Sequence, residues 1–155
     1  VLTTQTLYDG FLDDSRDRAF LHSHSYTGNP LACAAALASL DIFASDDVLA
    51  RNRDTAKTMR ELAVGIGRHR HVADVRQAGM IVAFELARDG DKRTPFDPAL
   101  RIGLHAYRAA LARGVLLRPL GDVLYWMPPY CIDAAQLQQL AETTLAAIEE
   151  ATACV

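Results

Sequence analysis

Residues 71–86 read HVADVRQAGMIVAFEL, and this stretch predicts two consecutive β-strands. From Met80 to Leu86 a larger apolar side chain stands at every second position, which is the period of a strand with one buried face. Gly79 separates the two runs and predicts a bulge or a bend between them. We therefore expect both strands to cover a hydrophobic core with one face.

The pattern continues on the C-terminal side with a helix, a second strand pair and a final helix. Pro98 is expected to open a helix over residues 98–114, and Gly114 to end it. Residues 115–130 predict two strands with a turn at Gly121-Asp122, and Asp133 is expected to cap the last helix. The order β-β-α-β-β-α predicts a small two-layer α+β domain. On the core-facing side of the 98–114 helix we expect Leu100, Leu104, Tyr107 and Leu111.

The first half of the chain predicts helices and loops without a sheet. Thr3 or Thr4 can cap a short helix that runs to Phe11. Asn29 is a good N-cap, and Pro30 suits the first position of a helix that reaches about Ala44. The small side chains of that helix let another backbone approach closely. We therefore expect a tightly packed internal helix.

The cysteine in that helix, Cys33, is expected to behave as a small buried hydrophobe. Ser45 or Asp46 is then expected to cap a second helix that runs to about His69. The length of this second helix and its charged outer face suit a connector between two lobes. We interpret the first half as the tail of a larger α/β domain, and Val1 as the end of a buried strand in a longer protein.

Composition excludes several classes of function. The 155 residues include 16 basic and 19 acidic side chains, so a nucleic-acid partner is not expected. No apolar run reaches the roughly 18 to 20 residues that cross a bilayer, and the N-terminus lacks the pattern of a signal peptide. Three widely spaced cysteines form no CxxC pair, which favours a reduced, cytoplasmic setting.

Residues 22–30, HSHSYTGNP, place hydroxyl groups and backbone N–H groups directly before a helix N-terminus. Such a segment can bind an anion, because its donors and the helix dipole both favour negative charge. A polar loop with satisfied histidines explains the same residues. His22 and His24 would share a face in an extended segment, but no third ligand is nearby, so no metal site is expected.

Arg118 interrupts an apolar strand pair in the stretch GVLLRPLGDVLYWMPPY, residues 114–130. A guanidinium there needs a carboxylate or phosphate partner, which can be a bound ligand or an internal Asp or Glu. Both interpretations stay open on these residues alone. Tyr125 and Trp126 point to opposite faces of their strand, so only one of them can share a side with Arg118.

The segments around residues 22–43, 72–86 and 114–130, in this order and spacing, resemble the C-terminal part of the class III pyridoxal-phosphate (PLP) aminotransferases. The resemblance covers nearly the whole chain. It implies the C-terminal portion of a PLP-dependent transferase type I fold. Residues 1–45 would be the tail of the large PLP-binding domain, and residues 46–155 the linking helix and the small α+β domain.

The resemblance also implies the site residues. In the family, active sites lie at the interface of a homodimer, and the segment matching 23–25 reaches across to the neighbouring subunit. Ser25 stands where a hydroxyl binds the PLP phosphate, and His24 would contribute to the same cofactor site. Ser23 would line the substrate pocket. Arg118 matches the arginine that holds the carboxylate of the keto substrate, and Tyr125 matches a tyrosine of that pocket.

Within the class, the resemblance is strongest to members that move an amino group from S-adenosylmethionine to 8-amino-7-oxononanoate in biotin biosynthesis. Other class III donors, such as ornithine, 4-aminobutyrate or ω-amino acids, form the alternative. The family's cofactor-attaching lysine and its pyridine-pairing aspartate both precede the position of Val1, so this chain has no catalytic residue of its own. We expect the 155 residues alone to be inactive. A non-catalytic module that binds a partner is a third possibility.

Overall fold

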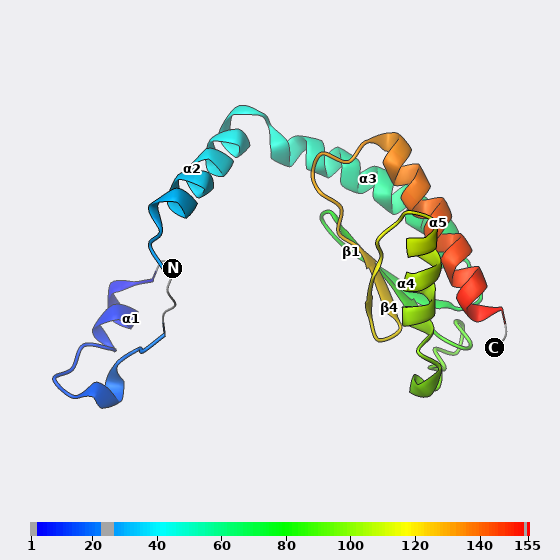
Figure 1. The fold of residues 1–155 in the computed structure, drawn as a ribbon, viewed down its shortest axis with the longest axis horizontal. Coiled ribbons are helices and arrows are strands. Elements are labelled where there is room, and N and C mark those ends of the chain that lie inside the picture. The colour runs from blue at the N-terminus through cyan, green and yellow to red at the C-terminus, as the bar shows by residue number, and fades with distance from the viewer. Residues whose placement is uncertain (1–2, 23–26, 154) are drawn as a thin grey trace. The chain divides into compact units, whose positions relative to one another are not determined.

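The computed structural model describes residues 3–22, 27–153 and 155. The chain divides into two compact units, Val1–Ile42 and Phe43–Val155. Figure 1 shows the ribbon of both units, with labels on the α-helices and on two of the strands, β1 and β4.

The N-terminal unit consists of helices and loops, as expected. Helix α1 spans Gln5–Asp9, a 3₁₀ turn spans Arg16–Arg18, and helix α2 begins at Pro30 and ends at Ser45, just inside the second unit. The Thr4 hydroxyl oxygen accepts the Leu7 N–H at 3.4 Å, so the expected N-cap is confirmed, although α1 ends before Phe11.

The start of α2 also agrees with the sequence prediction. The Asn29 Oδ1 accepts the backbone N–H groups of Leu31 at 2.9 Å and Ala32 at 3.2 Å. These two bonds satisfy donors that a helix N-terminus leaves without an intrahelical partner.

The expected burial of α2 is wrong for this structure. None of its side chains is buried, and Cys33 is exposed rather than a buried hydrophobe. Small side chains allow a close neighbour but do not supply one, because burial needs an element packed against the helix. Within the described residues, every side chain of α2 is exposed, although the Phe43 ring contacts the ring of Tyr130.

The C-terminal unit contains a four-stranded antiparallel sheet with the strand order β1-β2-β4-β3. Its order of elements confirms the predicted β-β-α-β-β-α arrangement after the first long helix. The elements are α3 (Val48–Gly67), β1 (Val72–Ala78), β2 (Ile81–Leu86), a 3₁₀ turn (Pro98–Leu100), α4 (Ile102–Ala112), β3 (Arg118–Leu120), β4 (Val123–Trp126) and α5 (Ala134–Thr152).

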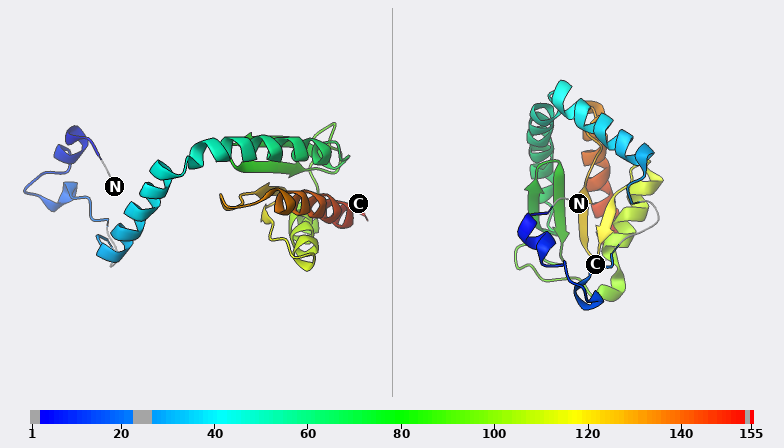
Figure 2. Two further views of the ribbon diagram at one scale, coloured as in Figure 1. Left: turned by 90° about the horizontal axis from the view of Figure 1, so that it is seen from above. Right: turned by 90° about the vertical axis from the view of Figure 1, so that its left-hand side faces the viewer.

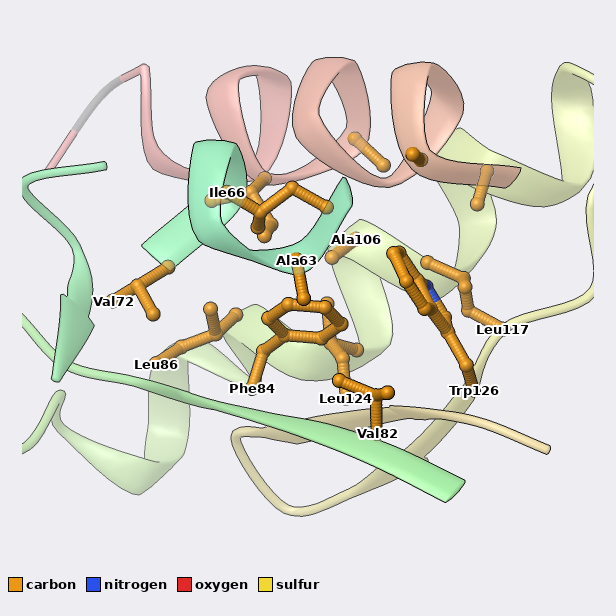
Figure 3. Packing of buried hydrophobic residues seen from close by; sticks show 14 of the residues in the cluster. Ala63, Ile66, Val72, Val82, Phe84, Leu86, Ala106, Leu117, Leu124 and Trp126 are labelled. Carbon is orange, nitrogen blue, oxygen red and sulfur yellow. The ribbon is translucent and has the colours of Figure 1, made fainter. Parts of the chain in front are cut away.

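One face of the sheet and three helices enclose the core. Figure 2 shows α3 running along β1 and β2. The alternation in β2 is confirmed, since Val82, Phe84 and Leu86 are buried while Ile81 is exposed. Figure 3 shows Phe84 and Trp126 between the sheet and the helices, and their ring centroids lie 4.9 Å apart.

Two polar groups in this core satisfy each other. The indole Nε1–H of Trp126 donates to the Thr144 hydroxyl on α5 at 2.9 Å, and that hydroxyl donates to the Leu140 carbonyl at 2.7 Å. Both side chains are buried, so the bonds avoid the cost of an unpaired polar group in an apolar environment. They also fix β4 against α5.

Two predicted helix starts are corrected. Asp47, with φ of 50°, is the N-cap of α3 and makes no side-chain cap bond. Neither Ser45 nor Asp46 takes that position, because α2 continues to Ser45 and the Ser45 hydroxyl donates to Asp46 at 2.7 Å. The predicted 98–114 helix is broken at Arg101, whose φ of 49° separates the 3₁₀ turn from α4.

The predicted core face of the 98–114 helix is only partly right, since Leu104 and Tyr107 are half-buried. Leu100 and Leu111 are exposed. A Cβ on Gly103 would lie 2.0 Å from the Gly121 carbonyl oxygen, so the β3–β4 turn touches the α4 backbone. This close approach leaves no room for a side chain at Gly103. The buried residues of α4 are Ile102, Gly103, Ala106, Ala109 and Ala110.

Within the residues that the structure describes, no helix is both long and apolar enough to pass through a bilayer.

Candidate functional site

The β3–β4 hairpin brings Arg118 and Tyr125 together. The two residues are direct cross-strand partners, so their side chains lie on the same face of the sheet. The guanidinium carbon of Arg118 lies 5.9 Å from the centroid of the Tyr125 ring, within the range of a cation–π contact. Trp126 points into the core, which confirms that only one of the two aromatic residues shares a side with Arg118.

Arg118 has no acidic partner among the described residues. It is exposed, and none of the ion pairs in that part of the chain includes it. The sequence left an internal Asp or Glu open as its partner, and the described structure does not contain that pair. The positive charge of Arg118 is therefore available to a ligand.

Another arginine, Arg76, forms ion pairs with the carboxylates of β1 and β2. The Arg76 Nη1 lies 2.6 Å from Glu85 and 2.9 Å from Asp74. These hydrogen bonds, first to Glu85 and then to Asp74, raise the pKa of the Arg76 guanidinium. Glu85 lies opposite Val123 on β4, and Val123 is two positions before Tyr125 on the same strand. Glu85 is therefore the acidic residue nearest to Tyr125 along the sheet, but its carboxylate is already paired with Arg76.

A hollow of about 490 Å³ adjoins Arg118 and Tyr125. This volume falls within the range of roughly 300 to 1,000 Å³ that small-molecule sites occupy. A cation at an apolar wall fits a substrate that carries a carboxylate on an aliphatic chain. The wall includes Leu116, Trp126, Met127, Pro128, Ile132 and Leu140.

Sequence reasoning missed two polar residues of this hollow, Gln136 and Gln139. Both lie at the start of α5, three positions apart, so they share one side of the helix. The sequence does contain a signal for them: two glutamines at helical spacing follow the Pro128-Pro129 pair, which comes directly after the neighbouring strand. Gln136 is partly committed, because its side-chain oxygen accepts the Asp133 N–H at 3.0 Å.

The predicted anion-binding residues Ser23, His24 and Ser25 lie outside the described residues, so their roles stay predictions. His22, which is described, has its ring 5.6 Å from that of Phe20. Within the described part of the chain, no three His, Cys, Asp or Glu side chains gather as metal ligands would.

The sequence has two lysines, and neither is placed to attach a cofactor. The Lys57 Nζ lies 2.8 Å from Asp54 and the Lys92 Nζ lies 3.3 Å from Asp89, with both side chains more than 70% exposed. A lysine that forms a covalent bond to a carbonyl cofactor needs a desolvated setting that favours its neutral amine.

The family profile of the class-III aminotransferases matches residues 1–148. The chain belongs to this family. Among its relatives, an adenosylmethionine-8-amino-7-oxononanoate aminotransferase of Geobacter sulfurreducens is 45% identical over 142 residues, which are 91% of this chain and 31% of that protein. A protein of the same name from Nitratidesulfovibrio vulgaris is 43% identical, over 95% of this chain and 27% of that protein.

Solved aminotransferase structures show the same fold. The adenosylmethionine-8-amino-7-oxononanoate aminotransferase of Methanocaldococcus jannaschii superimposes with a TM-score of 0.84 at 32% identity, covering 96% of this chain and 34% of that one. A PMP-bound aminotransferase of Vibrio fluvialis gives a TM-score of 0.81 at 26% identity, and the match covers 88% of this chain and 30% of that one. The expected fold, the C-terminal portion of a type I PLP-dependent transferase, is confirmed.

The chain spans about a third of the length of the class III relatives that it matches. Its described residues fit only part of a PLP site. Arg118 and its hollow suit a carboxylate substrate, whereas Lys57 and Lys92 do not suit attachment of the cofactor.

Proposed function

We propose that this chain is the C-terminal part of an aminotransferase that moves an amino group from S-adenosylmethionine to 8-amino-7-oxononanoate, giving 7,8-diaminononanoate in biotin biosynthesis. The observation that carries the proposal is Arg118, which lines an apolar hollow and has no acidic partner within the described residues. The names of the relatives at 45% and 43% identity support the choice of substrates.

In this proposal Arg118 binds the carboxylate of the keto substrate through two parallel N–H bonds. Tyr125 lines the same pocket and holds the guanidinium by its ring. The aliphatic chain of the substrate lies along the apolar wall that includes Met127 and Pro128. A carboxylate bound in this way orients the distal carbonyl, because one end of a flexible chain is fixed.

The N-terminal part of the proposed site would act in a homodimer. The Ser25 hydroxyl would bind the phosphate of PLP held by a second subunit, with His24 beside it and Ser23 at the substrate. PLP supplies the electron sink of the complete enzyme. Residues 1–45 would belong to the large domain and residues 46–155 to the linking helix and the small domain. We place the enzyme in the cytoplasm, with its cysteines reduced.

The isolated 155-residue chain is proposed to be inactive, because neither lysine is placed to attach the cofactor. Mixing the chain with PLP and reducing with borohydride tests this. We expect only weak, scattered labelling by mass spectrometry, and no turnover. A stoichiometric adduct at one lysine together with amino transfer would contradict the proposal.

The substrate assignment is tested in the full-length protein by replacing Arg118. We expect Arg118→Ala to raise the KM for 8-amino-7-oxononanoate by about tenfold or more, since a charge-assisted hydrogen bond contributes about 1.5–3 kcal/mol. Arg118→Lys should recover only part of the loss, because an ammonium lacks the planar fork. Arg108→Ala, an exposed arginine on α4, is the matched control.

The same assay separates the alternatives. Turnover with S-adenosylmethionine, and none with ornithine, 4-aminobutyrate or ω-amino acids, supports the proposal. Faster turnover with one of those donors would assign the chain to another class III transaminase. Absence of turnover with every donor would favour a non-catalytic module that binds a partner.

A further inference from the structure

A second hollow, of about 370 Å³, lies in the C-terminal unit and shares no lining residue with the Arg118 hollow. Its walls come from residues 49–60 of α3, the end of β1 with the turn that joins it to β2, and the segment that follows β4. We name it the α3 hollow. Its volume is in the range of small-molecule sites.

Three cations and no acidic residue line the α3 hollow. Arg53, Lys57 and Arg60 occupy positions i, i+4 and i+7 of α3, which are on one side of a helix. Lys57 pairs with Asp54, and Arg53 makes no ion pair within the described part of the chain. Like charges four residues apart repel each other on a helix, and a bound anion would reduce that repulsion.

Arg60 is held in place by a neutral residue. Its Nε donates to the Gln77 side-chain oxygen at 2.9 Å. Gln77 is itself anchored, because its Nε2 donates to the Ala56 carbonyl at 2.7 Å and to the Gly79 carbonyl at 3.1 Å. The two Nη groups of Arg60 have no protein partner within the described residues. The guanidinium is therefore fixed through one nitrogen and keeps its other donors for a ligand.

Apart from the polar side chain of Asn52, the remaining side chains of the wall are apolar or aromatic. They include Leu49, Ala56, Met80 and Tyr130, and the Tyr130 ring is steadied by an edge contact with Phe43 at 6.2 Å between centroids. A simple inorganic anion would leave this wall unused. A ligand with an anionic group joined to a flat or apolar body would contact both parts of the hollow.

We propose that the α3 hollow binds an organic phosphate, with the phosphate on Arg53, Lys57 and Arg60 and an aromatic body against Met80 and Tyr130. A phosphate monoester carries about −1.5 to −2 charges at neutral pH, which matches three cations better than a single carboxylate does. Arginine forks also bind phosphate oxygens in pairs. This inference is independent of the proposed aminotransferase function.

The experiment titrates the 155-residue chain with adenosine 5′-monophosphate, inorganic phosphate and adenosine, and follows backbone amide shifts by NMR. We expect adenosine 5′-monophosphate to bind more tightly than inorganic phosphate or adenosine. The largest shifts should occur at Gln77, at Gly79 and in the first half of α3. Equal affinity for inorganic phosphate and the nucleotide would overturn the assignment of the aromatic wall. Shifts outside the hollow would overturn the site.

Two neighbouring arginines provide a matched pair. Arg53→Ala and Arg51→Ala each remove one exposed arginine from α3, but only Arg53 lines the hollow. We expect Arg53→Ala to weaken nucleotide binding by about tenfold and Arg51→Ala to leave it within about twofold. Arg60→Gln should also weaken it. Equal affinities in all three variants and the unchanged chain would overturn the proposal, and circular dichroism checks that each variant is folded.

Discussion

Gly103 shows how a single position controls the packing of the C-terminal unit. It is buried in the first turn of α4, where the Gly121 carbonyl oxygen occupies the space of a side chain. Its N–H donates to the Asp122 carboxylate at 3.0 Å. The same turn thus caps α4 and excludes any Cβ, a requirement that hydrophobic periodicity does not reveal.

We predict that Gly103→Ala destabilises the C-terminal unit by about 1–3 kcal/mol, the usual cost of overpacking a tight contact. The obstacle is backbone, so it cannot move aside as a flexible side chain could. Urea unfolding measures the change. Gly65→Ala is the control, since a Cβ there meets nothing within 4 Å and alanine favours a helix. Equal stability of the two variants would contradict the prediction.

His69 gives the unit a dependence on pH. Its Nδ1 accepts the His71 N–H at 3.2 Å in the turn before β1. Partial burial, and then the charge of His71, hold the pKa of His69 below its ordinary value of about 6.5, Arg70 lowers it further, and Glu149 acts in the opposite direction. Protonation of Nδ1 would remove the acceptor of this hydrogen bond.

Because the folded pKa of His69 is lowered, the unfolded state takes up a proton first as the pH falls. Stability is therefore unaffected by this group above about pH 6.5 and decreases from there down through the folded pKa. We predict that the urea midpoint falls between pH 7.5 and pH 5.5, and that His69→Asn reduces the fall. His105→Asn on the exposed side of α4 should retain it. An unchanged slope in His69→Asn would contradict this cause.

Among the elements, α5 has a complete local start signal. The Asp133 carboxylate accepts the Gln136 N–H at 2.8 Å, and the Gln136 side chain accepts the Asp133 N–H at 3.0 Å. This reciprocal capping box satisfies two groups at the helix end. Since α5 packs against both α3 and α4, its first turn matters for the whole unit.

We predict that Asp133→Ala lowers the stability of the C-terminal unit by about 1 kcal/mol, the usual cost of losing an N-cap. Asp133→Ser should lose little, because a serine hydroxyl accepts the same N–H. Thermal unfolding followed at 222 nm measures both variants. A loss in Asp133→Ser as large as in Asp133→Ala would show that the carboxylate charge, and not the cap bond, stabilises the helix.

At the scale of the whole molecule, the hydrophobic core lies entirely in the second unit. Every buried core residue falls between Val48 and Ile148, whereas α1 and α2 have none. Apolar burial is the main stabilising contribution to a fold. The two units therefore differ in what stabilises them: within the described residues, α2 relies on its own hydrogen bonds and on the ring contact between Phe43 and Tyr130.

We predict that residues 43–155 unfold with the same urea midpoint as the full 155-residue chain. In the full chain, amide hydrogens of α2 should exchange far faster than those of β2, since short helices without tertiary packing are marginal in water. Hydrogen exchange by mass spectrometry measures this directly. Slow exchange in α2 comparable with that in β2 would contradict the prediction.

The sequence by itself determined the family, the order of strands and helices, the Asn29, Asp133 and Gly114 helix ends and the identity of Arg118. These follow from local patterns, such as side-chain alternation, cap residues and motif spacing, that need no knowledge of distant neighbours. Ser23, His24 and Ser25 stay predictions from the sequence.

Only the tertiary structure decided which surfaces are buried and which charges are free. It exposed α2 and Cys33 and turned a small-residue face of α4 to the core. Among the described residues it also placed Arg118 beside Tyr125 without an acidic partner, while Arg76 pairs with Glu85. Burial and ion pairing depend on what another segment places nearby. A pattern within one segment cannot specify that neighbour, because the contact is made by residues far away in the chain.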